Sequence, residues 1–237
     1  MNANANPVIS ASHDFAAARN EMVARQIRAR GIRSPRILDA MFAVPRHEFV
    51  PPESAASAYS DVPLPIGGGQ TISQPFMVAA MADAALLDGS ERVLEIGAGS
   101  GYQAAVLSLL AREIVVVELL PELARACRER LARLGYPNVR VEEGDGSLGW
   151  PARAPYDAII VSAAAPAVPA PLLAQLAEGG RLVIPVGTAE QQDLLRIVKR
   201  GGATTSESLF VCRFVPLLGR HGWPATPPQT NPGIPRE

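Results

Sequence analysis

The sequence predicts an α/β fold: a doubly wound, mostly parallel sheet with helices on both faces, an antiparallel C-terminal edge and added N-terminal helices. Three observations support this prediction. From Arg92 onward, short apolar runs alternate with segments whose apolar residues recur at helical spacing, as in parallel sheets covered by helices. Three closely spaced glycines follow the first of these runs. Two strand-like runs without a helix between them stand near the C-terminus.

Two short helices are expected before the sheet. The segment Asn20–Arg30 carries apolar residues at helical spacing and stops at Gly31, a residue type that commonly ends helices. Ser34 has the character of an N-cap residue, and Pro35 suits the first helical position, where its missing N–H is not needed. The second helix should therefore begin at Pro35.

A long loop is expected between Pro63 and Pro75. The stretch is polar and contains three consecutive glycines, residues that interrupt regular structure. Loops of this length are uncommon in compact domains unless they serve a function. The segment is therefore a candidate for part of a functional site.

The elements of the main sheet follow from the alternating runs. Apolar runs predict strands, and the helical patterns between them predict the connecting helices. The expected strands are Val93–Ile96, Ile114–Val117, Val139–Val141, Ala158–Val161 and Leu182–Pro185, and the expected helices are Tyr102–Leu110, Pro121–Leu134 and Pro171–Leu176. Two further strand-like runs, Asp193–Val198 and Leu209–Val215, are joined by a link that contains two glycines and Thr204-Thr205. We expect them to form an antiparallel pair at one edge.

The length and composition predict one domain. The chain has 237 residues, of which 48% are hydrophobic and 19% charged, enough for a single well-buried core. We expect this domain at residues 19–218. Residues 1–14 lack the basic start and apolar centre of a signal peptide, and residues 1–18 are expected to be disordered. Prolines recur after Gly219, so residues 219–237 are expected to form a disordered tail.

The charge and the cysteine content disfavour several function classes. A formal net charge of −1 gives no overall attraction to nucleic acid or to an anionic membrane. The two cysteines and three histidines show no disulfide-framework or metal-ligand spacing. The apolar stretch 158–177 contains three prolines and does not suit a membrane-spanning helix. We expect a monomeric cytoplasmic protein without a metal site. The arginines of segment 124–133 should form the solvated face of an amphipathic helix.

The glycine cluster predicts a ligand site. Gly97, Gly99 and Gly101 follow a strand that contains Glu95, and in an open parallel sheet ligands bind beyond the carboxyl ends of the strands. Glycine permits positive φ and a close approach of backbone to ligand. Glu118 ends the next strand, where its carboxylate can accept hydrogen bonds from both hydroxyls of a ribose. The third glycine comes one residue earlier than in the dinucleotide-binding pattern, which disfavours a dinucleotide.

This pattern resembles that of class I S-adenosylmethionine-dependent methyltransferases. In that reading Asp145 lies near the adenine amino group and the backbone of Gly146 reads the ring edge; the alternative is an ordinary Asp-Gly turn. Amino-group methyltransferases commonly carry an Asn/Asp-Pro-Pro-aromatic motif after the strand that ends at Val161. This chain has Ser162 followed by three alanines, which favours an oxygen nucleophile.

A narrower resemblance comes from the segment Pro65–Met77, which contains Thr-Ile-Ser-Gln-Pro. Together with Val44-Pro45-Arg46, the glycine motif, Gly144-Asp145-Gly146 and Arg213–Leu217, it resembles the protein-L-isoaspartate O-methyltransferase family over about residues 20–217. The resemblance implies methyl transfer from S-adenosyl-L-methionine to the α-carboxylate of L-isoaspartyl residues in damaged proteins and peptides.

The resemblance also implies residue roles. Ser73 is the active-site serine, with Thr71 and Ile72 beside it as substrate-binding residues. The implied cofactor-binding residues are Glu95, Gly97, Gly99, Gly101, Glu118, Asp145 and Gly146. Phe76 stands where some relatives carry histidine, so no role for that histidine is expected here.

Other readings stay open at this point. The chain could be another class I methyltransferase that acts on a small molecule or RNA, a dinucleotide-binding oxidoreductase, or a non-catalytic module that binds S-adenosylmethionine. Ser73 could also be an N-cap residue of the helix that begins near Pro75. Transfer to a carboxylate agrees with the few catalytic side chains in the sequence, because this acceptor is ionised at neutral pH and needs no general base.

Overall fold

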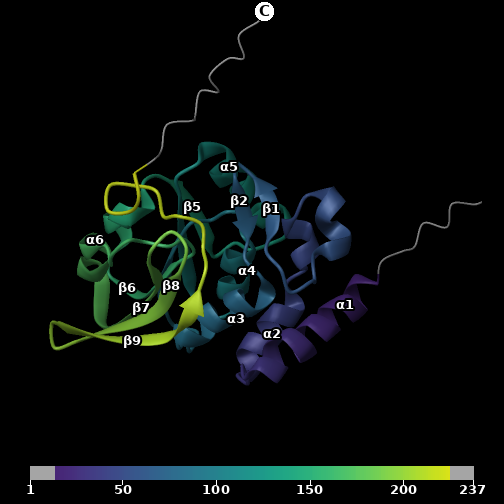
Figure 1. Ribbon diagram of the computed structural model, residues 1–237, viewed down its shortest axis with the longest axis horizontal. Coiled ribbons are helices and arrows are strands. Elements are labelled where there is room, and N and C mark those ends of the chain that lie inside the picture. The colour runs from purple at the N-terminus through teal and green to yellow at the C-terminus, as the bar shows by residue number, and fades with distance from the viewer. Residues whose placement is uncertain (1–13, 225–237) are drawn as a thin grey trace, which may run out of the picture.

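The computed structural model describes residues 14–224, and its centre is a seven-stranded sheet in the order β5-β4-β3-β6-β7-β8-β9 (Figure 1). The strands are β3 (Arg92–Ile96), β4 (Glu113–Glu118), β5 (Val139–Glu143), β6 (Tyr156–Val161), β7 (Leu176–Gly187), β8 (Gln192–Arg200) and β9 (Ala203–Cys212). Neighbouring strands from β5 to β7 run parallel, and β8 pairs antiparallel with both β7 and β9. The predicted fold class is confirmed.

Strand β3 is the point at which the strand order reverses. It pairs with β4 on one side and with β6 on the other, so the connections that leave β4 and β6 pass to opposite sides of β3. Such a switch point leaves a crevice beyond the carboxyl ends of the strands. The fold therefore places a ligand crevice after Ile96, Glu118 and Val161.

Helices cover both faces of the sheet. Alternate residues of β3 point to opposite faces: Val93 belongs to a core cluster with residues of α2 (Pro35–Ala43), α3 (Pro75–Ala84), α4 (Tyr102–Ser108) and α5 (Pro121–Arg133). Leu94 packs into a second cluster that contains Leu172 of α6 (Ala170–Ala174). In Figure 1, α6 and α1 lie toward opposite sides of the molecule.

The first predicted helix is longer and less regular than the sequence indicates. Helix α1 (Phe15–Glu21) continues through a π-helical turn at Met22–Ile27 and a 3-10 turn at Arg28–Arg30, and Gly31 follows at φ 103°. Helix α2 begins at Pro35 as predicted, but the Ser34 side chain makes no capping hydrogen bond. The remaining 3-10 segments are Arg46–Phe49, Pro52–Ser57, Gly146–Leu148 and Pro151–Arg153.

The predicted loop at 63–75 is largely a β-hairpin. Strands β1 (Leu64–Gly67) and β2 (Gln70–Ile72) pair antiparallel. Gly68 and Gly69 turn the chain at φ +58° and +71°, a conformation that favours glycine. The glycine run is therefore the tip of a hairpin, and not an irregular loop.

Several element boundaries also differ from the prediction. Thr204 and Thr205, which were expected in the link, belong to β9, because their β-branched side chains suit a strand. The sequence predicts that Leu176 ends a helix, but this residue begins β7. The predicted strand 209–215 ends earlier than expected, because β9 stops at Cys212.

The chain ends are more ordered than the sequence suggests where they are described. Residues 15–18 form part of α1, and the segment 219–224 hydrogen-bonds to Asp145, Ser147 and Ala164. Residues 1–13 and 225–237 lie outside the described part, and the domain limits 19 and 218 stay a prediction. Among the described residues, no helix has the length and apolar character needed to cross a membrane.

Candidate active site

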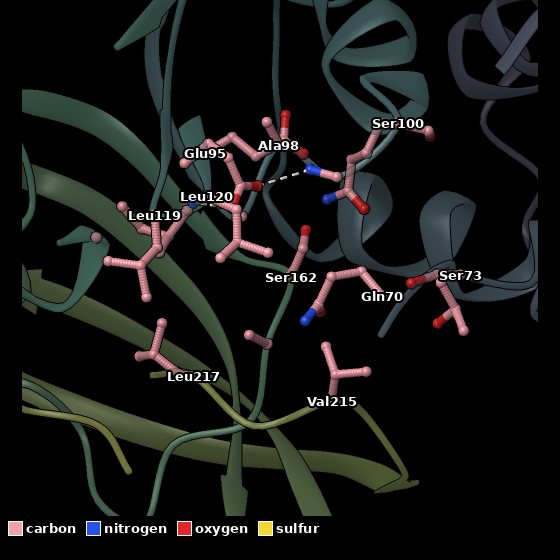
Figure 2. A pocket seen from close by; sticks show the side chains of 18 of the residues that line it. Gln70, Ser73, Glu95, Ala98, Ser100, Leu119, Leu120, Ser162, Val215 and Leu217 are labelled. Atoms are coloured by element: carbon pink, nitrogen blue, oxygen red, sulfur yellow. Dashed lines mark hydrogen bonds between the residues drawn. The ribbon is translucent and has the colours of Figure 1, made fainter. Parts of the chain in front are cut away.

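A cavity of about 990 Å³, its open mouth included, lies beyond the carboxyl ends of β3, β4 and β6. Its walls come from the β1–β2 hairpin, the glycine turn after β3, the residues after β4 and β6, Gly146, and the segment 215–218. Figure 2 shows Glu95 and Leu120 on one side of this cavity, Gln70 and Ser73 on the other, and Ser162 between them.

Two of the three motif glycines open their backbone to the cavity. Gly97 and Gly99 line it with φ +90° and +51°, and the Gly99 N–H donates to Glu118 Oε2 at 2.9 Å. A Cβ at residue 99 would lie 3.3 Å from Ile66 Cδ1 of the hairpin. The Gly97 N–H donates to the Val117 carbonyl at 2.9 Å, so both N–H groups are paired within the protein, and the absence of side chains at these residues leaves room for a ligand to approach the backbone.

Gly101 has a different environment, because it does not line the cavity. It is the N-cap residue of α4 at φ +87°, and a Cβ there would lie 2.8 Å from Cys127 Sγ of α5. Its observed role is to let α4 pack closely against α5.

Two buried glutamates form the acidic side of the cavity. Glu118 is 6% exposed and accepts from Gly99 N and, at 3.0 Å, from Leu120 N. Each oxygen keeps a lone pair for a further donor. Glu95 is 1% exposed, and neither of its carboxylate oxygens has a hydrogen-bond partner among residues 14–224. Burial first, and then the charge of Glu118, raise the pKa of Glu95 well above its usual range.

The two residues of the Asp-Gly motif, Asp145 and Gly146, differ in whether they line the cavity. Gly146 lines the cavity, and a Cβ there would collide with Ile96. Asp145 is not a lining residue: its carboxylate accepts from Ser147 N at 2.9 Å, Ser147 Oγ at 2.6 Å and Arg220 N at 2.7 Å. Asp145 therefore reaches the cavity only through Gly146 and the C-terminal segment.

The three predicted substrate residues lie together on the hairpin side. Thr71, Ile72 and Ser73 all line the cavity at the end of β2. Ser73 does not cap α3, whose N-cap residue is Gln74 without a side-chain capping bond. The structure thus leaves the Ser73 hydroxyl on the cavity side of the loop rather than at the helix end.

Two polar cavity residues are given no site role by the sequence, although the sequence places Ser162 at a strand end beside the crevice. Gln103 and Ser162 line the cavity, and Gln103 Nε2 and Ser162 Oγ are buried without a partner in the described part of the chain. Gln103 stands in the first turn of the helix after the glycines, and Ser162 stands directly after a strand. Both positions are signals that could have identified them.

The expectation that the α5 arginines form a solvated face is incomplete for Arg130, which is only partly exposed, whereas Arg128 is exposed. Arg130 donates from Nη1 to the Ser100 carbonyl at 2.8 Å and so holds the glycine turn. Burial lowers the pKa of Arg130. Arg128 donates to the Val141 carbonyl at 2.9 Å.

The charges of the cavity suit a cationic ligand on one side and a neutral or anionic one on the other. The acidic side holds Glu95 and Glu118, whereas Gln70, Thr71 and Ser73 on the hairpin side are neutral hydrogen-bonding groups. Among the described lining residues there is no Lys, Arg or His. No cluster of three or more His, Cys, Asp or Glu side chains suited to a metal occurs within residues 14–224.

Comparison with known proteins decides the family. A family model described as protein-L-isoaspartate(D-aspartate) O-methyltransferase matches residues 17–222. The chain belongs to this family. A protein-L-isoaspartate O-methyltransferase 2 of Pelobacter propionicus is 57% identical over 207 residues, which cover 86% of this chain and 92% of the relative. A protein-L-isoaspartate O-methyltransferase of Methanoculleus marisnigri is 55% identical, with 86% and 93% coverage.

Solved structures agree with this assignment. One named protein-L-isoaspartate O-methyltransferase superposes with a TM-score of 0.76 at 30% identity, covering 86% of this chain and 66% of the solved one. A second, a putative family member from Plasmodium falciparum in complex with S-adenosyl-L-homocysteine, gives 0.72 at 26% identity, with 84% and 98% coverage. The predicted family, enzyme class and cofactor, S-adenosyl-L-methionine, are confirmed, and the alternative functions are not favoured.

Proposed function

We propose that this methyltransferase transfers a methyl group from S-adenosyl-L-methionine to the free α-carboxylate of L-isoaspartyl residues in damaged proteins and peptides. The ester then closes to a succinimide, which starts repair. The observation that carries the proposal is that the loop of Ser73 and the Gly99–Glu118 pair line one cavity without a basic side chain among the described lining residues. An activated cation and an anionic acceptor can therefore meet there.

The glycine and acidic side of the cavity supports cofactor binding. S-adenosyl-L-methionine supplies a methyl group activated by a positively charged sulfur. The free lone pairs of Glu118 suit ribose hydroxyls, and Gly97 and Gly99 offer main-chain contacts. Glu95, buried and unpaired among the described residues, suits the cationic part of the ligand, because an opposite charge nearby favours the ionised carboxylate.

The hairpin side supports binding of the acceptor. A carboxylate is ionised at neutral pH, so these residues need to orient it and exclude water, and no proton has to be removed. A carboxylate oxygen forms the new C–O bond as the C–S bond breaks, and the positive and negative charges disappear together. We assign Ser73, with Thr71 and Ile72, to holding the acceptor in line with the methyl group.

The proposal also includes the partners, the oligomeric state and the location of the protein. We infer that the chain acts as a cytoplasmic monomer on isoaspartyl-containing proteins and peptides and binds neither nucleic acid nor membrane. The small net charge of −1 supports the last two points.

A labelled-methyl transfer assay with matched isoaspartyl and aspartyl peptides tests the proposal. We expect label on the isoaspartyl peptide only, and a loss of base-labile label after Ser73→Ala with unchanged cofactor affinity by calorimetry. Equal labelling of the two peptides, or none, would contradict the proposed acceptor. Wild-type turnover in Ser73→Ala would remove Ser73 from the catalytic residues.

A further inference from the structure

Ser162 occupies the centre of the cavity, between the cofactor side and the hairpin side (Figure 2). It follows β6 directly, and its N–H donates to the Ile96 carbonyl of β3 at 2.8 Å. Its hydroxyl is buried and has no hydrogen-bond partner among residues 14–224. A buried polar group without a partner calls for a specific reason, and an absent ligand is one such reason.

The backbone around Ser162 is held on both sides. A Cβ at Gly97 would lie 3.7 Å from Ser162 Cβ, so the serine packs against the glycine turn. Two residues later, Ala164 accepts from Leu217 N at 2.7 Å and donates to the Val215 carbonyl at 2.8 Å. The Ser162 hydroxyl is therefore fixed between the glycine turn and the C-terminal segment, as a group that orients a ligand must be.

The charges of the cavity decide which ligand this hydroxyl suits. Glu95 and Glu118 already supply the negative charge for a cationic cofactor. An acceptor carboxylate in the same cavity lacks a cationic partner among the described lining residues and has to be held by neutral donors. Neutral donors orient the carboxylate while leaving it more nucleophilic than a salt bridge would, since its charge is lost as the methyl group moves.

We propose that Ser162 donates a hydrogen bond to the acceptor carboxylate, as a second hydroxyl beside that of Ser73. This assignment rests on the proposed function and adds a substrate-binding residue to it. It also accounts for the small residue that follows: Ala163 lines the cavity and leaves room for the isoaspartyl group beside the hydroxyl.

The test compares Ser162→Ala, Ser162→Thr and Ser108→Ala. Ser108 is a matched control, because it is also a buried serine, but its hydroxyl donates to the Ala105 carbonyl within α4, away from the cavity. For Ser162→Ala we expect kcat/KM for an isoaspartyl peptide to fall about tenfold or more. Cofactor affinity, measured by calorimetry without peptide, should change less than about twofold. Ser162→Thr keeps the hydroxyl and should restore most of the loss, and Ser108→Ala should match the wild type in kcat/KM.

Two results would overturn the assignment while leaving the proposed function intact. One is an active wild type together with wild-type kcat/KM in Ser162→Ala. The other is an equal loss of cofactor affinity and of kcat/KM, which would make Ser162 a cofactor ligand. A wild type that labels no isoaspartyl peptide but still binds S-adenosyl-L-methionine would instead overturn the proposed function and, with it, this assignment.

Discussion

Arg46 donates from Nη2 to the main-chain carbonyl of Ser73 at 2.7 Å, across 27 positions of the chain. The arginine is fully buried. Its Nε donates to the Ala58 carbonyl at 2.7 Å, and its Cζ lies 4.7 Å from the centre of the Tyr102 ring. Burial lowers the pKa of Arg46. One guanidinium thus joins the N-terminal region, the loop of Ser73 and the helix that follows the glycine turn.

We predict that Arg46→Lys separates the position of Ser73 from cofactor binding. A lysine ammonium lacks the planar fork that serves two carbonyls at once, so one of them loses its donor. Turnover should fall about tenfold, and the free energy of unfolding should fall by about 1–3 kcal/mol. Cofactor affinity should stay nearly constant. Denaturant unfolding, calorimetry and peptide kinetics on one preparation measure all three quantities.

Arg133→Lys is the control for this substitution. Arg133 is an exposed arginine that pairs with Glu48 at 3.0 Å, and exposed pairs contribute only about 0–1 kcal/mol. It should leave turnover unchanged. If Arg46→Lys keeps full turnover at saturating peptide, the Arg46 contact does not position Ser73.

A second prediction concerns Glu95. Its buried carboxylate favours binding of a cationic ligand, but it lowers the stability of the protein without ligand. Its pKa is raised by burial and by Glu118, so ionisation costs stability in the folded state. Stability of the free protein should fall as pH rises from the ordinary glutamate value of about 4.3 toward the raised folded value. Glu95→Gln should remove this dependence, raise the free energy of unfolding at neutral pH by about 1 kcal/mol, and weaken cofactor binding.

Glu113 provides a control of opposite sign. Hydrogen bonding from Arg92 and the nearby arginines lower its pKa, and its carboxylate bonds to Arg92 at 2.9 Å and to Arg153 at 2.8 Å. Its contribution is present above the ordinary glutamate pKa and is lost as pH falls through the lower folded value. Glu113→Gln should therefore lower stability at neutral pH without changing cofactor affinity. Unfolding free energies at pH 5 and pH 8 for both variants check the two signs, and a destabilised Glu95→Gln would contradict the first.

A third prediction separates the motif glycines. Gly101→Ala should lower the free energy of unfolding by about 1–3 kcal/mol through overpacking against Cys127. Adding Cys127→Ala should recover part of this loss, while the strain of φ +87° remains. Gly99→Val should instead weaken cofactor binding in a folded protein, because residue 99 lines the cavity. Calorimetry on both variants decides, and normal cofactor affinity in Gly99→Val would place the ligand elsewhere.

The predictable part of the fold rests on local pattern. Ile114–Val117 and Ala158–Val161 are apolar runs between helical segments, and both lie within the parallel strands observed. The sequence predicts a loop at the hairpin 64–72 because three glycines interrupt two short strands, whose pairing depends on turn geometry at positive φ. Turn geometry of this kind is harder to predict from the sequence than a strand formed by a long apolar run.

The candidate site divides in a similar way. Glu118, Gly97 and Gly99 could be found because a strand end and a glycine spacing place them. The bonds of Arg46 to Ser73, Arg130 to Ser100 and Asp145 to Arg220 join residues 27, 30 and 75 positions apart. No local periodicity encodes such contacts, so the orientation of Asp145 toward the C-terminal segment emerges only from the folded chain.

That orientation underlies the fourth prediction. Ser147 Oγ accepts from His221 N at 2.9 Å, and the Trp223 indole N–H donates to the Ala164 carbonyl at 3.1 Å. These bonds, with those of Asp145, hold the segment whose Leu217 and Leu218 line the cavity. Burial raises the pKa of Asp145, but hydrogen bonds from Arg220 N and Ser147 outweigh it, and the net pKa is lowered.

Asp145→Asn should loosen this segment, because the amide turns an N–H₂ group toward donors that need an acceptor. The chain has two tryptophans, so a Trp150→Phe background leaves Trp223 as the reporter. The Trp223 emission should be constant from neutral pH to about 4 and change below that pH. The pKa of Asp145 is lowered in the folded protein, so the ionised carboxylate stabilises the segment at pH values above the ordinary aspartate pKa of about 3.9. This contribution is lost as the pH falls through the lower pKa of the folded protein. In Asp145→Asn the emission should already be changed at pH 7, the acid transition should be absent, and cofactor affinity should fall about tenfold through the displaced leucines.

Ser208→Ala, which removes a hydroxyl bonded to Asp193 on the far strand pair, should change none of these. A fall in affinity with an unchanged Trp223 spectrum would mean that Asp145 contacts the cofactor directly, as its place in the sequence motif implies, and not through the C-terminal segment.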